Sequence, residues 1–229
     1  LTSEAFLAKA QDETFIAQEV AKYPNLLGSL PTKDSGVRYR LEGYLFPATY
    51  TIKESTTVES LIDEMLAAMD KALSPHYNTI KEKNLTVNEL LSIASLVEKE
   101  GAKTEDRKMI AGVFYNRLNL GMPLQSNIAI LYAEGKLGQK ISLAEDAAID
   151  TTIDSPYNVY TNLGLMPGPV DSPSLDAIES SINQTKSENL YFVANVEDGK
   201  VYFAKTKEEH DQNVAEHINS KLPQSSSSN

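Results

Sequence analysis

Hydrophobic side chains recur every three to four residues along most of this chain, a spacing that places them on one face of a helix. The clearest case is 57–73, where the apolar face is formed by Val58, Leu61, Ile62, Met65, Leu66, Met69 and Leu73. The same spacing predicts helices at 1–23 (one helix or a pair), 87–101, 104–120, 174–182 and 207–222. A short helix is predicted at 142–148, because Ser142 and Glu145 have the spacing of a capping box.

Two short β-prone runs near the end of the chain, 190–194 and 200–204, flank Asp198-Gly199. An Asp-Gly pair between such runs predicts a β-hairpin. Glycine, proline and polar residues predict loops at 24–37 and 155–169, and 74–85 links the helix at 57–73 to the helix at 87–101. The sequence therefore predicts a helix-rich α+β fold with a small β-hairpin near the C-terminus.

The order of these elements suggests a division of the chain. Residues 1–84 form a helical N-terminal part, which contains the aromatic-rich connector LEGYLFPATY at 41–50. This connector is either buried core or the rim of a groove, since aromatic faces stack on sugar rings. Residues 85–222 form a second domain, and the serine-rich 223–229 is predicted to be a disordered tail.

Composition narrows the classes of function. The net charge of -11 argues against a nucleic-acid partner, because no excess of Lys and Arg is available to replace phosphate counterions. The chain has no cysteine, so disulfides and thiolate chemistry are excluded. No apolar run reaches the ~18 residues of a membrane span. The first residue is Leu, so we expect a piece of a longer protein from which a membrane anchor is missing.

Two carboxylates lie at the end of the predicted helix 87–101. At about 100° per residue, Glu100 falls in line with Ile93 and Glu98 with Leu91. A carboxyl group against apolar surface has a raised pKa, which allows it to serve as a general acid near neutral pH. The same spacing also fits two carboxylates that reach solvent from the last turn, and the geometry does not separate Glu98 from Glu100.

The sequence lacks the motifs that are typical of several kinds of catalytic chemistry. The three histidines show no metal-ligand spacing, and no nucleophile elbow, Walker loop or dinucleotide fingerprint is present. We therefore expect no metal and no cofactor. The chemistry that remains is acid–base catalysis by a carboxyl group. The surrounding Asn, Gln, Ser and Tyr residues suit the binding of a carbohydrate.

Several motifs together resemble one known family over about 40–222. They are LEGYLFPATY, ASLVEKEG, FYNRLNLGMPLQSN, SPYNVYTNLGLMPGPV, LYFVAN and the EEH at 208–210. Their order and spacing are similar to those of the YceG-like (MltG) endolytic murein transglycosylases. Two positions depart from the common pattern: Asn127-Ile128 stands where many members have Asp-Pro, and Met166 where many have Leu or Pro. We assign Asn127 no catalytic role.

The resemblance implies a lyase that cuts peptidoglycan glycan strands internally and leaves 1,6-anhydro-N-acetylmuramic acid ends. It also implies a single-pass protein of the cell membrane, with this region on the extracytoplasmic side and the membrane helix upstream of Leu1. Peptidoglycan strands are then the substrate, and proteins of a cell-wall synthesis or division complex are expected partners.

The resemblance also implies roles for individual residues. The second glutamate of EKE, which is Glu100, would be the catalytic acid and base. The groups expected to bind sugar hydroxyl and N-acetyl groups are Asn116, Gln125, Ser126, Tyr157, Asn158 and Tyr160. Glu98 would point about 160° away from Glu100 on the same helix, so we expect it to be structural. Two alternatives stay open: a hydrolytic muramidase and a non-catalytic peptidoglycan-binding module.

Overall fold

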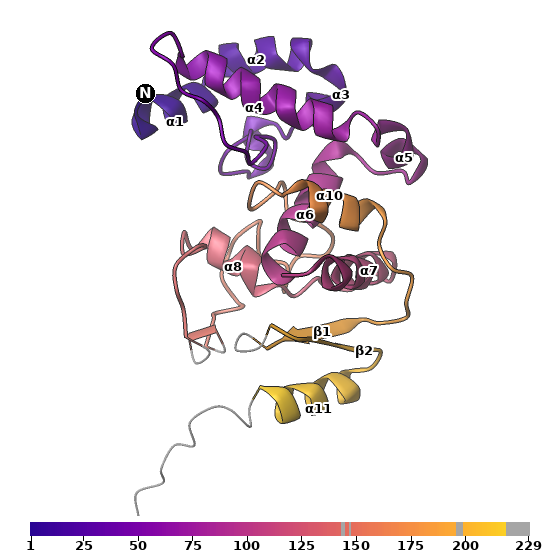
Figure 1. The fold of residues 1–229 in the computed structure, drawn as a ribbon. Coiled ribbons are helices and arrows are strands. Elements are labelled where there is room, and N and C mark those ends of the chain that lie inside the picture. Colours follow the sequence, from indigo (N-terminus) through magenta and orange to yellow (C-terminus); the bar gives the residue numbers. More distant parts are fainter. Residues whose placement is uncertain (143–144, 147, 196–198, 219–229) are drawn as a thin grey trace, which may run out of the picture.

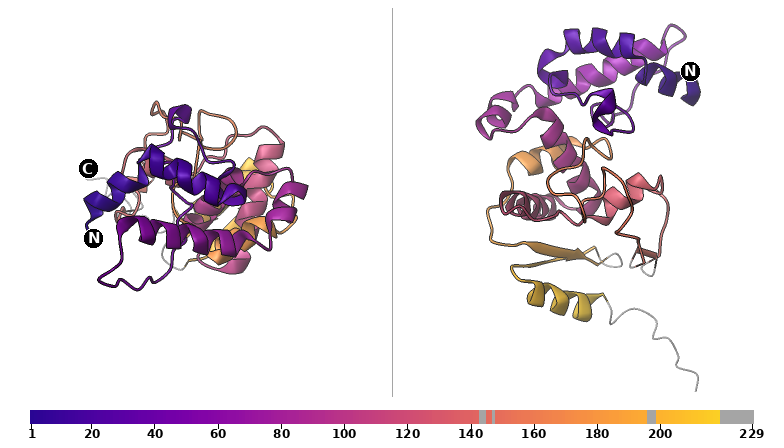
Figure 2. Two further views of the ribbon diagram at one scale, coloured as in Figure 1. Left: turned by 90° about the horizontal axis from the view of Figure 1, so that it is seen from above. Right: turned by 180° about the vertical axis from the view of Figure 1, so that it is seen from behind.

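The computed structural model describes residues 1–142, 145–146, 148–195 and 199–218. The helices α1 to α5 form one end of the elongated molecule, and the β-hairpin and α11 form the other (Figures 1 and 2). The helix α6 (Val87–Glu100) runs between the two ends. The predicted α+β class is confirmed, since the strands form one two-stranded antiparallel sheet in the described part of the chain.

The N-terminal helices begin where the sequence offers capping side chains. A pair, α1 (Ser3–Ala10) and α2 (Glu13–Lys22), occupies the predicted 1–23, with Thr2 and Asp12 as their N-caps. The amphipathic helix α4 (Val58–Leu73) is confirmed, and Thr57 caps it through a capping box.

The segment predicted to be a loop, 24–37, and the link 74–85 both contain short helices. The segment 24–37 holds α3 (Pro24–Leu27) and the 3-10 turn η1 (Lys33–Ser35), and 74–85 holds α5 (Tyr77–Glu82). The loop prediction was wrong there because helices of four to six residues are too short to show a hydrophobic period. Proline at the first position of α3 begins that helix, since it needs no N–H partner there.

The helix α6 joins two hydrophobic clusters. Leu90, Leu91 and Ala94 pack with the N-terminal helices, whereas Leu96 and Val97 pack with the second cluster. The first half of the connector belongs to the first cluster, where Leu41 and Tyr44 are buried, whereas residues 47–49 are exposed. The division of the chain at residue 85 stays a prediction, and α6 contributes to the packing on both sides of it.

The second cluster holds the remaining elements. The helix α7 (Thr104–Asn119) lies beside α6, and α10 (Leu175–Ile182) packs on both. The helix α8 (Asn127–Ala133) follows a short loop, and 155–169 is irregular, as predicted.

The C-terminal hairpin closes this part of the molecule. Strands β1 (Tyr191–Ala194) and β2 (Val201–Ala204) pair antiparallel with Tyr191 opposite Ala204, and α11 (Lys207–His217) covers them. This confirms the predicted hairpin, although Asp198 of its turn lies outside the described residues.

Three further expectations fall wholly or partly outside the described residues. The tail 223–229 and the end of the predicted helix 207–222 do so, as do 143–144 and 147 of the predicted helix 142–148. The capping hydrogen bonds between Ser142 and Glu145 are present. Within the described ranges, no helix is both long enough and apolar enough to cross a bilayer.

Candidate active site

Glu100 is the last residue of α6, and Gly101 follows it as the C-cap. Gly101 has an extended backbone (φ -117°) that any residue adopts, so the cap does not depend on the backbone freedom of glycine. Glycine is required here by close packing instead. A Cβ atom at this position would lie 2.8 Å from Cγ and 3.3 Å from Cα of Arg107 on α7.

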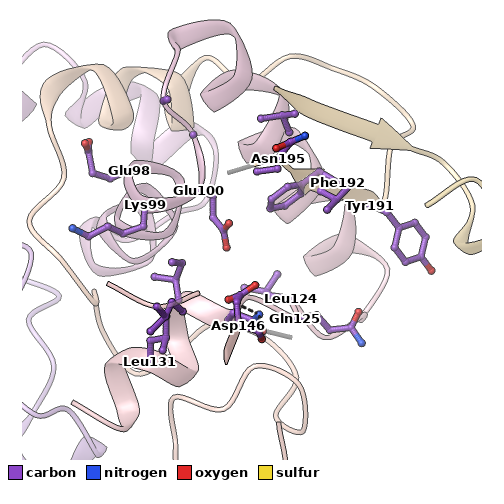
Figure 3. Close-up of a pocket in the computed structure, with 18 of the residues that line it drawn as sticks. Glu98, Lys99, Glu100, Leu124, Gln125, Leu131, Asp146, Tyr191, Phe192 and Asn195 are labelled. Carbon is purple, nitrogen blue, oxygen red and sulfur yellow. Dashed lines mark hydrogen bonds between the residues drawn. The ribbon is translucent and has the colours of Figure 1, made fainter. Parts of the chain in front are cut away.

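The side chain of Glu100 faces a cavity of about 910 Å³. The end of α6 forms one wall, α8 with residues of 137–142 and Asp146 forms another, and the strands β1 and β2 with α11 form a third. Figure 3 shows the Glu100 carboxyl group directed into this space, with Tyr191 and Phe192 on the hairpin side. Tyr191 stacks on His210 of α11, with ring centroids 5.4 Å apart.

The carboxyl group of Glu100 is sheltered from water and held by one hydroxyl. Ser126 Oγ donates a hydrogen bond of 2.7 Å to Oε1 of Glu100. Burial raises the pKa of Glu100 to about 7, the hydrogen bond from Ser126 lowers it, and the charge of Asp146 raises it further. Glu100 is therefore protonated in much of the population near neutral pH, as a general acid must be.

A chain of hydrogen bonds borders the same space. Tyr160 donates to Oδ1 of Asn127 at 2.6 Å, and Nδ2 of Asn127 donates to Oδ1 of Asp146 at 3.1 Å. Burial and the nearby Glu100 raise the pKa of Tyr160 to about 12, so its hydroxyl stays protonated. All three side chains line the cavity with Glu100.

A buried arginine fixes the loop that carries Ser126. Arg117 on α7 donates to the backbone oxygens of Pro123, Leu124 and Leu190, at 2.8, 3.2 and 2.6 Å. It also donates to Oε1 of Gln125 at 3.0 Å. One side chain thus connects α7, the loop before α8 and the start of β1.

Gln125 itself has a strained backbone. Its φ of 57° lies in the left-handed region, which costs a non-glycine residue energy. Its N–H donates to the oxygen of Val159 at 3.0 Å, which ties it to the irregular segment 155–169. The next residue, Ser126, is thereby presented to Glu100.

Glu98 has a structural position, as the helical geometry indicates. Its Oε1 accepts from Arg107 at 2.8 Å, and its Oε2 accepts from the backbone N–H of Ser174 at 3.0 Å. The side chain of Ser174 in turn caps α10. Glu98 therefore holds α6, α7 and α10 together, and both of its oxygens are used.

The structure brings together four of the predicted site residues: Glu100, Gln125, Ser126 and Tyr160. The other three lie away from the cavity lining. Nδ2 of Asn116 donates to the oxygens of Ser187 and Asn189, and Tyr157 is buried against Tyr132 with ring centroids 4.8 Å apart.

Asn158 is the third predicted site residue that lies away from the cavity lining, and its side chain is fully buried. Its amide nitrogen donates to the oxygens of Thr151 and Ile153, and its amide oxygen accepts from the N–H groups of Tyr160 and Thr161. Asn158 thus shapes the loop that carries Tyr160.

Sequence reasoning missed Asp146 and the role of Arg117. Asp146 has no local signal in the sequence, because its place in the cavity is seen only in its contacts with Asn127 of α8. For Arg117, its place on the inner side of an amphipathic helix was a signal, because a buried arginine needs several acceptors.

Together, the fold and the site define an α+β protein in which a half-buried carboxylic acid with a raised pKa lines a cavity of about 910 Å³. Such a site suits acid–base chemistry on an extended polar substrate. A crystal structure of a YceG-like protein from Listeria monocytogenes superposes with a TM-score of 0.81 at 38% sequence identity. The match covers 93% of this chain and 67% of that one.

The model of the YceG-like family matches residues 1–216. This chain belongs to the YceG-like family. It is 84% identical over 222 residues, or 97% of its length, to a protein of Streptococcus pneumoniae (strain D39) named endolytic murein transglycosylase. It is 38% identical over 94% of its length to the Bacillus subtilis (strain 168) protein of that name. The chain spans 40% of the pneumococcal relative and 58% of the Bacillus relative.

Proposed function

We propose that this chain cleaves the glycosidic bond between N-acetylmuramic acid and N-acetylglucosamine within peptidoglycan strands, as a lytic transglycosylase. The observation that carries the proposal is the Glu100 carboxyl group, which has a pKa of about 7 and faces a cavity of about 910 Å³. The printed names of the relatives point to the same activity.

In the first step, Glu100 acts as a general acid. Its proton passes to the glycosidic oxygen while the bond from that oxygen to the anomeric carbon of the muramyl residue breaks. The leaving sugar departs with a hydroxyl group, positive charge develops at the anomeric carbon, and Glu100 becomes a carboxylate. The hydrogen bond from Ser126 favours that charged form.

In the second step, the same carboxylate acts as a general base. It removes the proton of the C6 hydroxyl of the muramyl residue, and the C6 oxygen bonds to the anomeric carbon. The products are a 1,6-anhydromuramyl end and a free sugar end, and Glu100 has regained its proton. No water is consumed, so the reaction needs no second carboxylate to activate one.

The expected sugar-binding residues divide by position. Gln125, Ser126 and Tyr160 are close enough to Glu100 to contact a bound sugar. Asn116, Tyr157 and Asn158 act by holding the neighbouring loops, because their described partners are backbone groups or core side chains. Asn127 acts as an intermediate between Tyr160 and Asp146.

The substrate also fixes where the chain works. Peptidoglycan lies outside the cytoplasmic membrane, so we place this chain on the extracytoplasmic side, attached to the membrane by a segment that is not part of it. Proteins of cell-wall synthesis or division are the expected partners, which is consistent with the names of the relatives.

A hydrolytic muramidase is the second candidate, and Asp146 is the observation that favours it. A hydrolase that inverts configuration uses one carboxyl group as acid and a second to activate water. Asp146 lines the same cavity as Glu100. The amide of Asn127 occupies one of its oxygens, and the relatives' names favour the lytic reaction.

Mass spectrometry of peptide-free glycan strands after incubation with the chain tests both candidates. Anhydro ends are expected from the parent chain and from Asp146→Asn, and no cleavage is expected from Glu100→Gln. Glu105→Gln is the matched control, because its side chain is 81% exposed on α7. It should cleave like the parent.

The products separate the alternatives. Reducing ends that disappear with Asp146→Asn would establish the hydrolase. Anhydro ends that persist with Glu100→Gln would assign the acid to another residue. Strand binding without any cleavage by the parent chain would establish a binding module in place of the enzyme.

A further inference from the structure

A second cavity of about 250 Å³ adjoins the first one. The two cavities share Lys99, Leu137 and Gly138 as lining residues, so they meet at the end of α6. Figure 3 shows Lys99 and Glu100 pointing to different sides of this helix end. A substrate that contacts Glu100 can therefore extend past Lys99 into the second cavity.

An arginine is held in place on the wall of the second cavity. One guanidinium nitrogen of Arg38 donates to the oxygen of Ala133 at 2.9 Å. The guanidinium carbon lies 4.7 Å from the ring centroid of Tyr132, above its face. A guanidinium group carries five N–H donors in a planar fork that matches a carboxylate. Arg38 is thus pre-oriented to bind an anion at little cost in side-chain entropy.

The charged side chains that line this cavity are Arg38, Lys99 and Asp171. Lys99 pairs with Asp171 at 2.7 Å, so these two charges offset each other. Glu42 is outside the lining; it accepts from Tyr132 at 3.4 Å, and burial raises its pKa while the charge of Arg38 lowers it. Among the lining residues the positive charges therefore exceed the negative ones by one, which favours an anionic ligand.

The proposed substrate offers such a group at regular intervals. Each muramyl residue carries a lactyl ether on C3, which ends in a carboxylate or continues into a peptide with carboxylates of its own. N-acetylglucosamine has no such group. An enzyme that cuts within a strand must also hold sugar residues on both sides of the broken bond, so the substrate extends beyond the catalytic cavity.

We propose that the second cavity is a subsite for the acidic C3 substituent of a muramyl residue, with Arg38 binding its carboxylate. This inference rests on the proposed function for the identity of the ligand. It assigns to Arg38 the recognition of muramyl residues over plain N-acetylglucosamine polymers. Arg38 is a binding residue, remote from the bond that breaks.

The test measures binding alone, in the Glu100→Gln background, by titration calorimetry. The probes are a peptide-free tetrasaccharide of alternating N-acetylglucosamine and N-acetylmuramic acid, its peptide-bearing form, and chitotetraose. Arg38→Gln should weaken binding of the peptide-free muramyl probe about fivefold, the size of a partly exposed ion pair, and leave chitotetraose unchanged. Arg38→Lys, which keeps the charge, should recover part of the loss.

The remaining outcomes decide the proposal. A loss seen only with the peptide-bearing probe would support the subsite and identify the peptide carboxylate as the group bound. Equal losses for all three probes, or none, would overturn the proposal. Lys53→Gln removes one positive charge from an exposed loop and should change no affinity. Cleavage is assayed separately, so a chain that binds as expected but does not cleave would refute the proposed function alone.

Discussion

Ser126 stands at the N-cap of α8, yet its hydroxyl group donates to Oε1 of Glu100 at 2.7 Å and makes no capping hydrogen bond. A serine at this position usually accepts from a backbone N–H of the first helical turn, which stabilises the helix by about 1 kcal/mol. This residue gives up that contribution and directs its hydroxyl to the candidate catalytic acid. The Ser126 hydroxyl group therefore supports the candidate catalytic acid and adds no capping stability to α8.

Replacing Ser126 should therefore change the pH dependence more than the stability. Ser126→Ala removes a hydrogen bond that lowers the pKa of Glu100, so the pKa rises and the alkaline limb of the profile of kcat/KM moves to higher pH. Thr57→Ala, which removes a true cap of α4, should cost about 1 kcal/mol of unfolding free energy and leave the profile in place. A limb that moves to lower pH would refute the role given to Ser126.

Removing the buried acid should stabilise the protein at alkaline pH. The folded pKa of Glu100, about 7, is above its unfolded value, so the folded state binds more protons between the two values and stability falls as pH rises. Glu100→Gln removes this penalty, which is on the order of 2 to 3 kcal/mol at pH 8. Urea unfolding should show the gain at pH 8 and little difference at pH 4. An equal effect at both pH values would contradict the raised pKa.

Gly101 is expected to tolerate no Cβ atom. Gly101→Ala places a methyl group 2.8 Å from Cγ of Arg107, so α7 or the Arg107 side chain must shift. We expect a loss of about 1 to 3 kcal/mol, typical of overpacking, together with reduced cleavage, because Glu100 is the preceding residue. Thermal unfolding and the strand assay measure the two effects. Glu105, which is exposed on α7 and outside the cavity lining, is the control, and Glu105→Gln should match the parent chain.

Arg117 should matter for both stability and activity. Arg117→Met leaves the buried oxygen of Leu124 and the partly buried oxygens of Pro123 and Leu190 without their donor, which should cost about 3 kcal/mol in urea unfolding. The loop that presents Ser126 also loses its support, so kcat should fall at temperatures where the variant is still folded. Lys53→Met, on an exposed loop, controls for the loss of charge. If Arg117→Met is as stable as Lys53→Met, the structural role assigned to Arg117 is wrong.

The fold could largely be predicted because its signals are local. Hydrophobic period and capping residues located the long helices, and the prediction at 57–73 differs from α4 by the N-cap Thr57 alone. The short helices α3 and α5 could not be found in this way, because one or two turns show no periodicity and depend on packing with the N-terminal cluster.

The site was less accessible to sequence reasoning. Helical geometry separated the directions of Glu98 and Glu100, but the choice between them came from resemblance, since Arg107 and Ser174 approach Glu98 only in three dimensions. Asn116 and Asn158 show the same limit, because an amide that suits a sugar suits a backbone carbonyl equally well. Their predicted contacts with substrate remain predictions.

The helix α6 contributes side chains to both hydrophobic clusters without a break between its Thr86 cap and Glu100. Its 14 residues span about 21 Å at 1.5 Å per residue. The candidate acid is therefore held at a fixed distance from the N-terminal helices. The length of this one helix therefore sets how far the candidate active-site cavity lies from the N-terminal helices.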